Sequence, residues 1–153
     1  MTRGAFSEHT LRALELAGWS PERNVPTEHF EHGLSTEGYE VSPPVRAFLR
    51  SFGGIRLEYP HFRQPESLDH AHFDAIIAAE RIFKDHAVYW SEIAKQRLCV
   101  IGEAFDGGMT LLMGPDGTVF AGRDDLLLVV GIDGADAIEA LCAGHELHEV
   151  SSS

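Results

Sequence analysis

The side chains of this 153-residue chain that could do chemistry are mainly carboxylates and histidines. The carboxylates of interest gather around expected turns in the second half of the chain: Glu103, Asp106, Asp116, Asp124 and Asp125. A pair of them could transfer protons or hold a hard cation. Asp is also favoured in tight turns for local backbone reasons, and this explains Asp116. It does not explain Asp124 and Asp125, because adjacent like charges repel each other. We therefore interpret these two as candidate contacts for a partner.

The nine histidines include three pairs whose spacing suits metal ligands. These pairs are His29 and His32, His70 and His72, and His145 and His148. Each pair could supply two ligands to zinc, but none lies in a motif that supplies the third and fourth. We therefore expect no metal and no cofactor.

The motifs of common enzyme classes are missing from the sequence. It contains no Gly-x-x-x-x-Gly-Lys phosphate loop, no Gly-x-Gly-x-x-Gly fingerprint and no Gly-x-Ser-x-Gly elbow. Cys99 lies in an apolar run without an obvious histidine partner, and with Cys142 it is interpreted as a buried thiol. We expect no catalytic residues, so the chain is predicted not to be an enzyme.

The charge of the chain is unevenly distributed. The formal net charge is −12, and residues 99–153 hold one basic and ten acidic side chains, a net of −9. A negative field disfavours direct binding of nucleic acid and favours a basic protein partner. A plainer alternative is that the acidic surface only keeps the protein soluble.

The hydrophobic pattern predicts an α+β fold with a mostly antiparallel central sheet flanked by helices. Expected helices cover residues 7–17, 27–37, 42–52, 74–95 with a break near Lys84, and 133–144. Expected strands cover residues 55–59, 70–73, 98–101, 109–113, 118–121 and 126–132. Gly102 is expected to end its strand, Phe83 to face inward, and residues 126–132 to form the middle of the sheet.

The chain is predicted to form one domain over residues 1–144, followed by a polar tail over residues 145–153 that frays. The sequence has no apolar run long enough for a signal peptide or a membrane span. We therefore expect a cytoplasmic protein that does not contact a membrane, and its oligomeric state stays open.

Short motifs in both halves of the chain resemble one family in their order and spacing. They are Gly18-Trp19 with Pro21 and Arg23, Pro43-Pro44-Val45, Phe48-Leu49, Phe52-Gly53-Gly54, Ile101-Gly102-Glu103-Ala104, Met109–Met113, and Asp116-Gly117 with Val119 and Gly122. This pattern resembles the SUKH superfamily of bacterial immunity proteins, in particular its third subgroup. The resemblance implies a SUKH-like fold and a protein that binds and neutralises a cognate toxin domain, expected to be a basic nuclease of a polymorphic or contact-dependent toxin system.

The partner contacts are predicted from charge, aromatic character and position in the motifs. They are Glu103, Asp106, Asp124 and Asp125, with Trp19 and Tyr59 as aromatic anchors. Two other functions remain open. One is an intracellular regulatory or scaffold protein of the same fold that binds a host protein. The other is a small metal-dependent hydrolase that uses the acidic turns.

Overall fold

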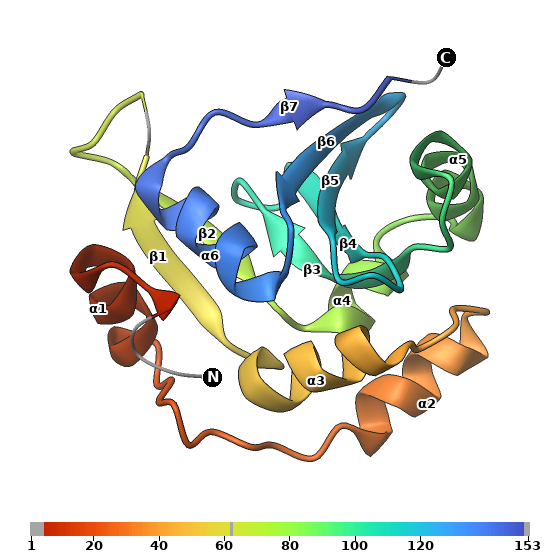
Figure 1. Ribbon diagram of the computed structural model, residues 1–153, viewed down its shortest axis with the longest axis horizontal. Helices are drawn as coiled ribbons and strands as arrows, with labels where there is room; N and C mark the ends of the chain where they lie inside the picture. Colours follow the sequence, from red (N-terminus) through yellow and green to blue (C-terminus); the bar gives the residue numbers. More distant parts are fainter. Residues whose placement is uncertain (1–4, 62, 152–153) are drawn as a thin grey trace.

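The computed structural model describes residues 5–61 and 63–151. Within these residues the chain forms six helices and one seven-stranded antiparallel sheet (Figure 1). The helices are α1 (Glu8–Leu16), α2 (Glu28–Thr36), α3 (Pro43–Phe52), α4 (Ala75–Glu80), α5 (Lys84–Ala94) and α6 (Gly134–Ala143). The strands are β1 (Arg56–Pro60), β2 (Leu68–His72), β3 (Cys99–Ala104), β4 (Met109–Met113), β5 (Val119–Arg123), β6 (Leu126–Gly131) and β7 (His148–Glu149). The predicted fold class is confirmed.

The strands lie in the sheet in the order of the sequence, from β1 at one edge to β7 at the other. Every neighbouring pair is antiparallel, so the sheet is a simple meander. β1, β3 and β5 therefore point the same way, and the turns that follow them lie at the same end of the sheet. α6 packs on β6 and α1 packs on α6, while α4 packs on β3 (Figure 1).

The helices begin where the sequence offers a capping side chain or a proline. Ser7 accepts a hydrogen bond from the Thr10 backbone N–H, Asp74 caps α4 and Asp133 caps α6. Pro43 opens α3, whose buried residues Val45, Phe48, Leu49 and Phe52 follow helical spacing and form one face. The break expected near Lys84 is also confirmed, because α4 ends at Glu80 and α5 begins at Lys84.

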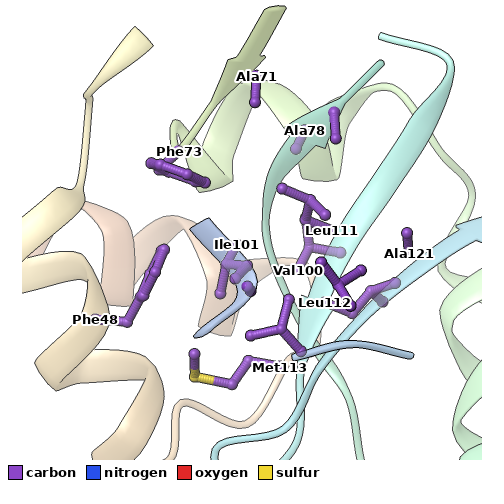
Figure 2. Close-up of a cluster of buried hydrophobic side chains, with 14 of the residues drawn as sticks. Phe48, Ala71, Phe73, Ala78, Val100, Ile101, Leu111, Leu112, Met113 and Ala121 are labelled. Atoms are coloured by element: carbon purple, nitrogen blue, oxygen red, sulfur yellow. The ribbon is translucent and has the colours of Figure 1, made fainter. Parts of the chain in front are cut away.

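The core lies between the sheet and the helices. Figure 2 shows side chains of α3, β3 and β4 meeting in one cluster, with Phe48 opposite Ile101 and Met113. Phe48 and Phe73 form an edge-to-face pair with ring centroids 5.1 Å apart. The middle strand of the sheet, β4, is buried along its whole length. Each fully buried large apolar side chain stabilises the fold by about 1.5–3 kcal/mol.

Gly102 lies inside β3, so the prediction that it ends the strand is wrong. A Cβ atom at Gly102 would lie 2.0 Å from the carbonyl oxygen of His72. Glycine is needed there because β2 and β3 approach each other closely beside a bulge. The strand consequently continues to Ala104 and carries Glu103 into the sheet.

Three other expectations differ from the structure. β6 is not the middle of the sheet, because β7 pairs with it on its outer side. Part of the predicted tail is therefore ordered, since His148–Glu149 satisfies backbone groups of β6 that would otherwise form an open edge. Phe83 is 79% exposed instead of facing inward. It precedes α5 at the N-cap position, which takes it out of the helical phase.

Among the described residues, none of the helices combines the length and the apolar character needed to cross a membrane.

Candidate functional site

One face of the β1–β2 hairpin is apolar and buried, and the other is polar. Leu57, Tyr59 and Ala71 are buried, whereas Glu58 and His70 alternate with them and are exposed. This alternation is typical of an antiparallel sheet with one face towards the core and the other towards solvent. The polar face is therefore the one that is accessible to solvent.

The polar face continues across the sheet as a row of directly opposite residues. The row runs through Arg56, His72, Glu103, Thr110 and Gly122. Side chains that are directly opposite on antiparallel strands lie on the same side of the sheet. The row therefore leads from the polar face of the β1–β2 hairpin to β4 and β5. At its far end, Trp90 of α5 lies against Gly122.

Glu103 lies at the centre of this row and is only 4% exposed. Its Oε1 atom lies 2.7 Å from Nε2 of His72 and 3.4 Å from Nε of Arg81. The backbone N–H of Asp74 donates to the other ring nitrogen of His72, at 3.1 Å. That nitrogen is therefore the unprotonated one, and His72 donates its Nε2 proton to Glu103.

This arrangement has a structural and a chemical consequence. Glu103 links β2, β3 and Arg81 at the end of α4, so its carboxylate is already engaged when a partner arrives. Both ring nitrogens of His72 are engaged as well, so His72 has no lone pair available to accept a proton from a nucleophile in this state. Glu103 thus holds the surface in shape, and a partner's cation would compete with His72 and Arg81 for it.

Asp106 lies in the turn between β3 and β4, and its side chain is 82% exposed. Phe105 and Asp106 both have a φ of +54°, a left-handed conformation that non-glycine residues seldom adopt. The turn is held in place because the Asp106 backbone N–H donates to the carbonyl oxygen of His70, at 3.0 Å. The His70 ring lies 3.4 Å from the Asp106 carboxylate. Asp106 is therefore an exposed charge on a fixed turn.

Asp124 and Asp125 form the two-residue turn between β5 and β6, and both are exposed. The buried Trp90 of α5 donates its indole N–H to the carbonyl oxygen of Asp124, at 2.9 Å. Its ring lies directly over Gly122, where any side chain would collide with it. The absence of a side chain at Gly122 thus lets α5 hold the turn that carries the two carboxylates.

These residues surround two adjoining depressions of about 290 and 400 Å³. Both depressions are lined by Arg81, Glu103 and Gly107, so they lie side by side, and together they are called the groove. Asp106 lines the first and Asp124 lines the second, whereas Asp125 lies beside the groove. The structure thus places Glu103, Asp106 and Asp124 around the two depressions, and their role as partner contacts stays a prediction.

The groove also contains basic residues that the sequence analysis did not select. Arg56 lines the first depression, Arg123 lines the second, and Arg81 lines both. The strand pattern could have found Arg56, since it alternates with the buried residues Ile55 and Leu57. Arg81 follows the end of α4 and Arg123 is the last residue of β5, and at the ends of elements periodicity carries little information. The groove therefore has a mixed charge pattern instead of a purely acidic one.

The two predicted aromatic anchors lie in the core. Trp19 is 2% exposed and stacks on Phe52, with ring centroids 5.5 Å apart. Tyr59 is 3% exposed, because it lies on the buried face of β1. In this conformation neither ring offers a partner an appreciable surface. Phe83 is exposed and contacts His86, a residue of the groove wall.

No three His, Cys, Asp or Glu side chains of residues 5–61 and 63–151 are arranged to hold a metal ion. Both cysteines are free and buried, as predicted. Burial raises the pKa of each thiol, Cys99 and Cys142, to about 12. Both thiols therefore stay protonated at neutral pH, the form that does not act as a nucleophile.

Comparison with known families assigns the chain. The model of the SUKH-3 immunity protein family matches residues 6–144, which is nearly the whole chain. The chain belongs to the SUKH-3 immunity protein family. The match includes Glu103, Asp106 and the Asp124–Asp125 turn, so the whole groove lies within the SUKH-3 domain. The comparison with curated proteins found no match, and neither did the comparison with solved structures.

Proposed function

We propose that this SUKH-3 family member binds a cognate bacterial toxin domain and neutralises it, and that the toxin is a basic nuclease of a polymorphic or contact-dependent system. Membership in an immunity protein family supports the first part of the proposal. The acidic character of the chain supports the second, because a basic toxin would be attracted to a protein with a net charge of −12.

The observation that carries this proposal is the position of three exposed carboxylates. Asp106 and the pair Asp124 and Asp125 occupy the turns after β3 and β5, which lie at the same end of the sheet. Both turns are fixed by hydrogen bonds, one to His70 and the other to Trp90. Carboxylates that are fixed before binding lose less conformational freedom when they meet Arg or Lys, which favours affinity.

A carboxylate surface of this kind can occupy the nucleic-acid site of a nuclease. Such a site binds phosphates through Arg and Lys, and carboxylates form comparable charge-assisted hydrogen bonds with the same groups. The interaction does not require an active site on this chain. It requires one end of the sheet to fit the toxin and to exclude its substrate.

The arginines of the groove give the surface specificity. Arg56, Arg81 and Arg123 would meet carboxylates of the toxin, so only a partner with the matching charge pattern would fit. Among aromatic contacts, the buried ring faces of Trp19 and Tyr59 would meet the partner only after a rearrangement, whereas Phe83 is exposed beside the groove. The two free thiols fit a reducing compartment, so we place this activity in the cytoplasm.

Charge reversal at the β5–β6 turn tests the proposal. The variant D124K/D125K should lower the affinity for the cognate toxin domain by about tenfold or more and weaken its dependence on salt. The control variant E22K/E37K changes the net charge by the same amount, at two exposed positions away from the groove. It should bind within about threefold of wild type, because only the long-range attraction changes. Equal affinities of the two variants would contradict the assignment of this surface.

A further inference from the structure

A second cavity, of about 680 Å³, lies on the side of the sheet that carries Tyr59 and α6, and at its edge it shares Gly108, Met109 and Arg123 with the groove. Its walls come from the ends of β1 and β2, the β3–β4 turn, β6, and the chain that leaves α6. Met109, Leu126, Leu128 and Leu141 make much of the lining apolar. The polar groups of such a cavity determine what it can bind.

Two of these polar groups are buried and lack adequate partners. Asp69 is 5% exposed, and its carboxylate accepts one hydrogen bond, from the backbone N–H of the next residue. Among the described residues, no Lys, Arg or His forms an ion pair with Asp69. Tyr59 lies directly opposite Asp69 in the sheet, and its buried hydroxyl has no hydrogen bond of regular geometry. Burial raises the pKa of Tyr59, the charge of Asp69 adds to this, and the Phe105 backbone opposes it.

The burial of Asp69 and Tyr59 without full hydrogen-bond or charge partners has an energetic cost. A buried carboxylate without a cation, and a buried hydroxyl without a hydrogen bond, each lower the stability of the folded state. Both line the same cavity. A ligand that brings a positive charge and hydrogen-bond donors would remove these costs.

We infer that this cavity receives a Lys or Arg side chain of a protein partner, with its charged head on Asp69 and Tyr59. The apolar walls suit the methylene stem of such a side chain, which packs well on apolar surface while its head stays polar. The acidic chain favours basic partners in general. Arg63, Arg123, His145 and Glu146 also line the cavity, so the entering cation has to pass a rim of mixed charge. The source of the side chain rests on the proposed function, in which the partner is a basic toxin.

Methyl NMR on the isolated protein tests the cavity without a toxin. The chain has three methionines. Met109 lines the cavity and also the second depression of the groove, so the D69N variant shows which of the two a probe occupies, and Met113 is buried elsewhere in the core. With the methionine methyls labelled with carbon-13, Nα-acetyl-lysine methylamide and its arginine counterpart should shift the Met109 signal at millimolar concentration. The Met113 signal should stay unchanged. The neutral isostere Nα-acetyl-norleucine methylamide should have little effect.

Two variants make this test decisive. D69N keeps the shape of the side chain and removes its charge, so the shift of Met109 should be lost. Y59F removes the hydroxyl alone and should weaken binding of both basic probes several-fold, which provides a second test if D69N does not fold. The inference is overturned if neither basic probe moves Met109, or if D69N responds as wild type does.

The toxin then separates this inference from the proposed function. D69N should bind the cognate toxin at least about 30-fold more weakly than wild type, because a buried charge pair loses one member. If wild type binds the toxin and D69N binds it equally well, the cavity inference is wrong and the proposed function stands. If wild type does not bind the toxin, the proposed function fails, whereas the probe experiment still decides what the cavity accepts.

Discussion

The contact between Gly122 and Trp90 gives a quantitative prediction about how the β5–β6 turn is held. A Cβ atom at Gly122 would lie 2.6 Å from two ring atoms of Trp90 and 2.9 Å from a third. Carbon atoms in good contact are about 3.5–4.0 Å apart. In the variant G122A the indole ring must therefore move by about 1 Å, unless β5 moves away from α5.

The energetic cost follows from this displacement. Overpacking of a core costs about 1–3 kcal/mol. A shift of the ring also breaks the hydrogen bond from Trp90 to Asp124, which is 2.9 Å long and contributes about 1 kcal/mol. Replacing Gly by Ala in a strand returns about 0.5–1 kcal/mol. The net destabilisation of G122A should be about 1–3 kcal/mol, which lowers the Tm by about 2–12 °C.

Urea denaturation followed by tryptophan fluorescence measures this loss. A double-mutant cycle with W90L identifies its cause, and Trp19 remains as the fluorescent reporter in that background. The cost of G122A should fall to about 0.5 kcal/mol or less when the large ring is absent. The explanation is refuted if G122A is as stable as wild type, or if it costs the same amount in the W90L background.

Two further substitutions test the polar contacts of the fold. Burial raises the pKa of Glu139, but hydrogen bonds from Ser7 and Thr10 outweigh it and lower the pKa below its usual value. Glu139 therefore stabilises the fold above the unfolded pKa, and this contribution is lost as the pH falls through the lower folded pKa. E139Q should lower the unfolding free energy by about 1–2 kcal/mol at pH 7 and flatten its decline in acid, and an unchanged decline would count against these contacts. E103A leaves the donor of His72 without its acceptor and should cost about 1–3 kcal/mol in urea denaturation, whereas a loss below about 0.5 kcal/mol would show that Glu103 does not hold the sheet.

Periodicity and turn chemistry were sufficient to predict most of the fold. Helix α3 begins at Pro43 and ends before two glycines, and its apolar residues follow helical spacing. Both its bounds and its buried face could therefore be predicted. The Asp116-Gly117 turn and the capping residue Asp133 also act through neighbours in the sequence. These features depend only on residues that are close together in the chain, so a single sequence is enough to predict them.

The errors arise where a distant part of the chain determines the conformation. Gly102 is a strand residue because the backbone of β2 approaches it, and no local pattern reports that approach. Phe83 has the residue type of a core position, but the break before α5 exposes it. The order of His148 depends on the free edge of β6, which exists only once the sheet has formed.

The same distinction applies to the candidate site. The carboxylates of Asp106, Asp124 and Asp125 could be selected because exposed turns are readable from sequence. The sequence could not indicate that Glu103 is buried against His72, since the two residues are brought together by strand pairing.

The central claim is that this SUKH-3 protein neutralises a cognate toxin by binding it. Co-expression with the toxin domain encoded nearest to its gene, scored by growth and by purification of a complex, tests this claim most directly. The account predicts that growth is restored and that the two proteins purify as a 1:1 complex. No restored growth and no complex would contradict it, and would favour a scaffold protein of the same fold.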